Sequence, residues 1–256
     1  MRVTKTTKLV LGAALAVAAS YTSQAALSQL SISHYAGSGY SFGLTVQGTS
    51  QTSYAVAFSA SLQSGDPLPT GHSSPFTTFC LDIDTTLANG WWQSGSFSEV
   101  PLTSDTGKVR QGVASLQYAA QLYQTFAGTI PAGGWTSAQK AEGSALQLAI
   151  WEVLYEYGTA GAFNLSSGPG FTVTSGDSAI RARAQDMLDS LTFGAPDTSL
   201  STTFWNAANA DGSARSSQDL IGPMTPIPEP TTCIAGALLL LPFLGSTLRV
   251  WQKRQS

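Results

Sequence analysis

Hydrophobic and polar residues alternate along the first third of the chain in the manner of β-strands. Every second position is apolar between residues 40 and 48, and the alternation returns over residues 52–62 after a short polar stretch. A period of two places one row of side chains in a core and the other row in solvent. The sequence therefore predicts a hairpin whose loop is residues 48–51. Two further strands are expected over residues 27–37 and 76–84.

The spacing of apolar residues becomes helical in the middle of the chain. Apolar positions three or four residues apart predict a helix over residues 106–127. Thr136 and Gln139 form a capping-box pattern, so a second helix is expected to begin there and to end near residue 157. Asp177 is expected to cap a third helix. The remaining strands are expected over residues 171–175, 202–207 and 215–221.

These elements together predict an α+β fold. Neither a repeat of fixed period nor an interdomain linker is evident within residues 26–222. We therefore expect one β-rich domain, a sandwich or barrel-like body with an inserted helical pair and a third helix.

Each end of the chain carries an apolar run next to basic residues. Residues 1–25 contain three basic residues, an apolar stretch and small residues before position 26, which is typical of a secretory signal peptide. Residues 231–248 are mostly apolar and predict a transmembrane helix, with residues 249–256 as a basic cytoplasmic tail. The basic residues of this tail are Arg249, Lys253 and Arg254.

A Pro-rich linker over residues 223–230 precedes the C-terminal apolar run and contains Pro228, Glu229 and Pro230. The order of Pro-Glu-Pro, an apolar helix and a basic end resembles the PEP-CTERM sorting signal of Gram-negative exported proteins. The resemblance implies that an exosortase, a membrane transpeptidase, handles the chain. It also implies a destination at the cell surface or in an extracellular matrix rich in exopolysaccharide. A permanent tail anchor is the alternative.

Composition fits an exported protein and excludes nucleic acid as a partner. Charged residues make up 11% of the chain, below the roughly 25% of a typical soluble protein. Between the two ends, six basic residues face fourteen acidic ones, for a net charge near −8. Phosphate backbones would repel such a body, so nucleic-acid binding is disfavoured.

Cys80 is the single cysteine of the predicted body, because Cys233 lies in the C-terminal apolar run. A lone cysteine in an oxidising compartment is expected to be buried, paired between chains or chemically committed. Gln147 is expected on the packed stripe of the second helix, where its carboxamide needs partners. A thiolate held beside that carboxamide could attack it, expel ammonia and leave a thioester. A low thiol pKa would speed the attack.

Phe79-Cys80-Leu81 on a strand, followed by a helix with Gln-x-Ala-Ile-Trp, resembles the thioester domains of bacterial surface proteins. The resemblance covers about residues 75–160 and implies a cross-link between Cys80 and Gln147. Leu146 stands where these domains usually have Thr. The implied function is covalent adhesion to an amine- or hydroxyl-bearing surface ligand or exopolysaccharide, in a single turnover and not as an enzyme. The supporting positions would be Phe79, Ala149, Ile150 and Trp151.

The alternative is a non-catalytic structural or carbohydrate-binding component of the matrix. Cys80 would then be an inert buried residue, and main-chain groups would satisfy Gln147. Trp91 and Trp92 could stack on sugars, although such aromatic residues more often cap a core. A hydrolase is the weakest interpretation, since the sequence has no nucleophile elbow or P-loop.

We expect no metal and no cofactor. The histidines His34 and His72 lack metal-ligand spacing. Asp82 and Asp84 are expected on a solvated strand face rather than in a calcium site. Glu152 and Glu156 are expected to form a mildly repulsive pair on one helix face.

Overall fold

The computed structural model describes residues 27–33, 39–62, 75–83, 92–101, 113–156, 163–193, 202–208 and 219–223. The chain divides into two compact units, Met1–Met224 and Thr225–Ser256, and every described residue belongs to the first. Helices and antiparallel sheets both occur in this unit, as the predicted α+β class requires.

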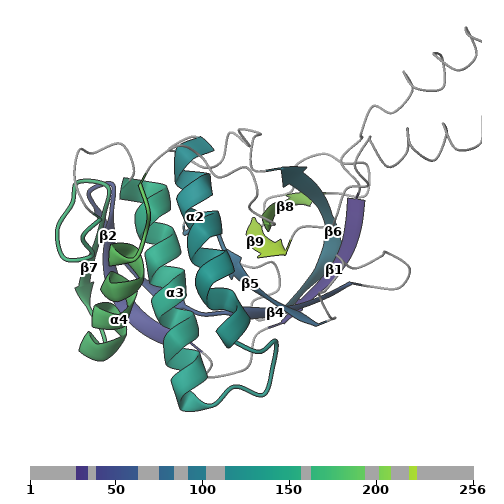
Figure 1. Cartoon of the computed structure of the whole chain (residues 1–256), viewed down its shortest axis with the longest axis horizontal. Coiled ribbons are helices and arrows are strands. Elements are labelled where there is room, and N and C mark those ends of the chain that lie inside the picture. The colour runs from purple at the N-terminus through teal and green to yellow at the C-terminus, as the bar shows by residue number, and fades with distance from the viewer. Residues whose placement is uncertain are drawn as a thin grey trace, which may run out of the picture. The chain divides into compact units, whose positions relative to one another are not determined.

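Six antiparallel strands close a barrel in the order β1-β4-β5-β9-β8-β6 (Figure 1). The alternation of apolar residues predicts most of these strands but not β6, whose sequence is dominated by small and polar residues. The pairing of β6 with β1 and β8 therefore depends on its neighbours in the sheet rather than on its own pattern. The barrel strands are β1 (Leu27–Ser33), β4 (Phe58–Leu62), β5 (Phe76–Cys80), β6 (Trp92–Pro101), β8 (Thr202–Ala208) and β9 (Leu220–Pro223).

A second, three-stranded sheet has the order β3-β2-β7. Its strands are β2 (Tyr40–Val46), β3 (Thr49–Ala55) and β7 (Phe171–Ser175). Phe42, Leu44 and Val46 are buried on one face of β2, which confirms the predicted alternation. The predicted loop over residues 48–51 is wrong, because residues 49–51 belong to β3. The turn is formed by Gln47 and Gly48, both at positive φ, which matches the twist of the flanking strands.

The predicted single strand over residues 52–62 is also wrong, because the chain passes there from one sheet to the other. β3 pairs with β2, whereas β4 pairs with β1 and β5. Tyr54 is 61% exposed at the end of β3, but every residue from Ala55 to Ala60 is buried. The segment between the two strands thus lies in the interior of the unit.

The helices form a layer in which α3 lies between α2 and α4 (Figure 1). α3 also contacts all three strands of the smaller sheet, and α2 contacts β8 and β9 of the barrel. Thr136 and Gln139 form the predicted capping box, and Asp177 caps α4 through two main-chain N–H groups. The helices are α2 (Val113–Phe126), the short 3₁₀ helix η1 (Ala127–Thr129), α3 (Ser137–Glu156) and α4 (Ser178–Asp189).

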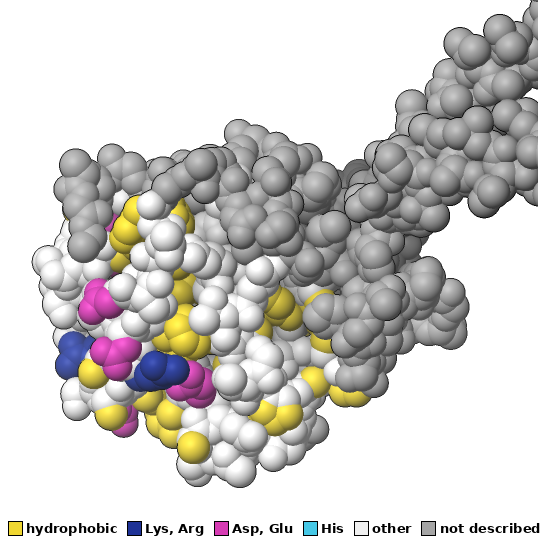
Figure 2. Space-filling model, viewed as in Figure 1, with side chains coloured by type: hydrophobic (Ala, Val, Ile, Leu, Met, Phe, Trp, Pro, Cys, Tyr) yellow, Lys and Arg dark blue, Asp and Glu magenta, His cyan; other side chains and the backbone are white. Residues whose placement is uncertain are grey.

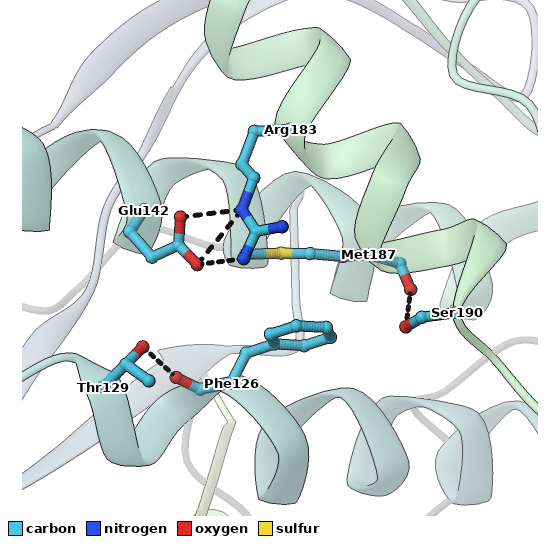
Figure 3. Close-up of polar contacts among 6 residues, drawn as sticks. All are labelled: Phe126, Thr129, Glu142, Arg183, Met187 and Ser190. Carbon is cyan, nitrogen blue, oxygen red and sulfur yellow. Dashed lines mark hydrogen bonds and ion pairs between the residues drawn. The ribbon is translucent and has the colours of Figure 1, made fainter.

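The side chain of Arg183 on α4 contacts both α3 and α2 (Figure 3). Arg183 of α4 donates to both carboxylate oxygens of Glu142 on α3, and the shortest of these distances is 2.7 Å. The same guanidinium lies 5.4 Å from the ring centroid of Phe126 at the end of α2. A two-pronged ion pair with a cation–π contact fixes both the spacing and the rotation of the helices.

α3 is buried around its whole circumference from Gly143 to Glu156. Its position between two helices and a sheet leaves no face for solvent, so polar side chains in this stretch need partners inside the protein. Ser144, for example, donates to the carbonyl of Ala55 at 2.7 Å. The buried polar residues of α3 therefore form hydrogen bonds that connect the helix to neighbouring segments.

Among the residues that the structure describes, no helix is long and apolar enough to cross a bilayer. The predicted signal peptide over residues 1–25, transmembrane helix over residues 231–248 and tail over residues 249–256 lie outside the described ranges. Of the linker predicted over residues 223–230, the structure describes Pro223 alone, as the last residue of β9. Pro228, Glu229, Pro230, Arg249, Lys253 and Arg254 therefore remain predictions from sequence. The same holds for His34, His72, Asp84 and Trp91.

Candidate functional site

Cys80 is the last residue of β5 and is 1% exposed. Neighbouring residues of a strand point to opposite faces, so Phe79 packs among the helices and Cys80 packs with residues of the barrel. The cluster around Cys80 is formed by Ile32, Val56, Phe58, Ala60, Phe76 and Leu220.

Gln147 lies in the middle of α3, is completely buried and contacts the main chain of Cys80. The N–H of Cys80 donates to Oε1 of Gln147 at 2.9 Å, and Nε2 of Gln147 donates to the carbonyl of Cys80 at 2.8 Å. The structure thus brings together the two residues that the sequence singles out, although they are 67 positions apart.

The carboxamide occupies a gap in the hydrogen bonding of the barrel. Phe58, the first residue of β4, pairs with Thr78 of β5. Main-chain groups two residues apart on a strand point to the same side, so Cys80 presents its N–H and C=O where β4 has not yet begun. Gln147 takes the place of the missing strand and satisfies both groups.

The thiol of Cys80 donates to the main-chain carbonyl of Asp82 at 2.8 Å. Burial raises the pKa of this thiol well above its usual value, and the negative charges of Asp82 and Asp219 raise it further. The Asp82 carboxylate also accepts from the N–H of Asp219 at 3.0 Å. The thiol is therefore protonated at neutral pH and lacks the low pKa that would speed its attack.

Two tyrosines that the sequence analysis does not single out hold β5 and the segment that follows it. Tyr155 of α3 accepts from the N–H of Ile83 at 3.0 Å, and Tyr123 of α2 donates to the carbonyl of Thr77 at 2.7 Å. Tyr155 is eight residues after Gln147 and therefore lies on the same face of α3. That spacing is the signal in the sequence that links Tyr155 to the site.

The four expected supporting residues all lie in the main hydrophobic core, where they position the strand and the helix. Phe79 packs edge-on against the ring of Tyr123, with 6.2 Å between the ring centroids. Trp151 is buried, and its indole N–H has no hydrogen-bond partner among the described residues. The supporting residues are Phe79, Ala149, Ile150 and Trp151.

Asp82 does not lie on a solvated strand face, because β5 ends at Cys80 and Asp82 is buried. The expectation of a solvated face is therefore wrong for this residue. Within the described ranges, no group of His, Cys, Asp and Glu side chains could hold a metal ion. Trp92 is the first residue of β6, and its side chain is not among those described.

Glu152 and Glu156 repel each other as expected, because the charge of Glu156 helps to raise the pKa of Glu152, but both residues are buried. Glu152 accepts from the N–H of Asn164 at 2.9 Å, and Glu156 accepts from the N–H groups of Gly170 and Phe171. Burial raises the pKa of Glu152 to about 8. The two carboxyl groups thus attach the loop before β7 to the end of α3.

Comparison of the chain with protein-family models, with curated proteins and with solved structures finds no match in any of the three. The assignment of a function therefore depends on the residues and the geometry of the chain itself.

Proposed function

We propose that this chain is an exported, surface-sorted bacterial protein in which Cys80 and Gln147 form an internal thioester for covalent attachment. One observation carries the proposal: the N–H of Cys80 lies 2.9 Å from Oε1 of Gln147. Negative charge develops on this oxygen when the sulfur attacks the carboxamide carbon. In serine proteases, the main-chain N–H of the nucleophile itself helps to bind the corresponding oxyanion.

The bond changes are as follows. The sulfur of Cys80 bonds to the side-chain carbonyl carbon of Gln147, the C–N bond breaks, and the thiol proton leaves with the nitrogen as ammonia. An amine of a target molecule then attacks the thioester carbonyl. This second step forms an amide to Gln147 and returns a thiol to Cys80, so each molecule reacts once.

Burial of the pair has opposite effects on these two stages. The raised pKa of the Cys80 thiol slows its attack, but a fixed neighbour can supply an effective molarity of about 10⁵ M or more. A bond that needs to form only once per molecule tolerates a slow step. Exclusion of water by the surrounding core protects the thioester from hydrolysis until the local structure opens to a target.

The proposed route to the cell surface depends on the two ends of the chain. The signal peptide directs export, and the Pro228-Glu229-Pro230 motif with its apolar run and basic end directs handling by an exosortase. Attachment at the cell surface or in an exopolysaccharide matrix agrees with the low content of charged residues, 11%.

A second candidate is a non-catalytic structural component of the same matrix. It is favoured by the hydrogen bonds already present, because both polar atoms of the Gln147 carboxamide and the Cys80 thiol have main-chain partners. In this case Gln147 joins α3 to β5 and Cys80 fills space in the barrel.

The intact mass of the full chain, purified from an exporting Gram-negative host, distinguishes the two candidates. A thioester predicts a mass one ammonia below that of the processed sequence, and addition of methylamine should replace the lost ammonia. Cys80→Ala should abolish both effects. A full mass together with a thiol that titrates only after unfolding would reject the thioester and favour the structural role.

A further inference from the structure

A groove that shares no residue with the Cys80–Gln147 pair lies between α4 and the turn that precedes β7. Its volume is about 610 Å³. Phe163 and Leu165, both largely buried, form an apolar wall. The polar side chains of the groove are Asn164, Ser166, Ser178, Arg181, Gln185 and Asp189.

The guanidinium of Arg181 is the unusual group in this groove. Its Nε is buried and has no hydrogen-bond partner within the described ranges, and no ion pair involves Arg181 there. Arg183, two residues further along α4, makes a two-pronged ion pair with Glu142. This buried nitrogen is out of a ligand's reach, but the Arg181 side chain as a whole is only partly buried and lines the groove. A ligand carboxylate at the accessible part of the guanidinium would supply the counter-charge that Arg181 lacks within the described ranges.

The acidic residues at the two ends of α4, Asp177 and Asp189, have other hydrogen-bond partners. Asp177 accepts from two N–H groups at the start of the helix, and Asp189 accepts from Nε2 of Gln185 at 2.8 Å. Asp189 lies eight residues after Arg181, which is roughly 12 Å along the axis of an α-helix. The groove therefore has a cationic end and an acidic end with neutral hydroxyl and amide groups between them.

Charged side chains are sparse elsewhere on the same face. Figure 2 shows that the Lys, Arg, Asp and Glu side chains visible on the described surface gather in the region of α4, while most of the rest is neutral. Residues of α4 line the groove, so the groove adjoins the most charged part of a surface that is otherwise poor in charge.

We infer that this groove binds an acidic saccharide. The carboxylate of a uronate unit binds at Arg181, and the sugar hydroxyls bind to the polar side chains between Arg181 and Asp189. The planar fork of a guanidinium matches a carboxylate, and carboxylate, amide and hydroxyl groups are the usual partners of sugar hydroxyls. An inorganic anion would leave the acidic end unused. A neutral sugar would leave the guanidinium charge without a counter-charge.

Calorimetric titration of the full chain with a trimer of galacturonic acid tests this inference. The protein carries Cys80→Ala, so that any binding is non-covalent and independent of the proposed thioester. The trimer should bind at least about tenfold more tightly than the neutral galactose trimer, because the pair between guanidinium and carboxylate is lost with the neutral ligand.

Variants in the groove define its two ends. Arg181→Gln should weaken binding of the acidic trimer about tenfold or more, whereas Arg183→Gln, which removes the same charge from the same helix, should change it by less than about threefold. Asp189→Asn should weaken binding of the saccharide without weakening any binding of sulfate. Circular dichroism and melting curves show that each variant is folded.

Three results would overturn the inference. One is an equal loss of affinity in the Arg181 and Arg183 variants, which would indicate a general charge effect. Another is equal binding of the acidic and neutral trimers. The third is a complete absence of binding by the parent protein.

Discussion

Gln147 pairs with the main chain of Cys80 as a residue of a neighbouring strand would, through one donated and one accepted hydrogen bond of 2.8 and 2.9 Å. A side chain on a helix thereby completes the edge of a barrel strand where β4 has not begun. This relationship places a carboxamide beside a thiol-bearing residue and also joins the helical layer to the barrel.

The structural part of this relationship can be measured without the thioester. In a Cys80→Ala background, Gln147→Leu leaves the N–H and C=O of residue 80 buried without partners. Each such group costs about 1–3 kcal/mol, so we expect the free energy of unfolding to fall by about 2–4 kcal/mol. Urea denaturation measures the loss. Gln124→Leu on the exposed face of α2 is the control and should stay within about 0.5 kcal/mol. Equal effects of the two substitutions would contradict the role of the carboxamide.

Glu152 predicts a dependence of stability on pH. Its pKa is about 8 in the folded protein, against a usual value of 4.5, because burial penalises the charged form. Between these values the folded state binds a proton that the unfolded state has released. Stability from this group is therefore complete below about pH 4.5 and is lost as the pH rises to about 8. Denaturation midpoints across this window measure the slope.

Glu152→Gln provides the test of that assignment, since the amide resembles the protonated acid at every pH. The variant should lose most of the decline in stability between mildly acidic and mildly alkaline pH. Glu142→Gln removes a partly exposed acid from the first half of the same helix and should retain the decline. A steep slope that persists in Glu152→Gln would assign the titration to another group.

The contact between Arg183 and Glu142 should contribute little to stability despite its good geometry (Figure 3). Both side chains are partly exposed, so solvent screens their attraction. A double-mutant cycle with Arg183→Ala and Glu142→Ala should give a coupling of about 0.5–1 kcal/mol that decreases with added salt. A coupling of several kcal/mol that is insensitive to salt would contradict this expectation.

The approach of the loop before β7 to α3 depends on Gly170. A Cβ at this position would meet the carbonyl oxygen of Tyr155 and would lie 2.9 Å from Oε2 of Glu156. Gly170→Ala should therefore lower the free energy of unfolding by about 1–3 kcal/mol. Gly128→Ala is the matched control, because a Cβ there meets no atom within 4 Å. Thermal unfolding compares the two, and equal melting temperatures would show that the loop can move away.

Features that depend on a few adjacent residues are evident from the sequence. The capping box of Thr136 and Gln139, the N-cap Asp177 and the buried row on β2 all agree with the structure, because each is set by interactions within one element. The burial of Gln147 follows in the same way from the apolar residues around it on one helix.

Only the tertiary structure decides features that depend on contacts between distant segments of the chain. It divides the expected strand over residues 52–62 between two sheets and adds β6, whose own sequence has little alternation. It also buries Glu152, raises the pKa of the Cys80 thiol and leaves Arg181 in a groove. Desolvation and strand pairing act between segments far apart in the chain, so no local pattern specifies them.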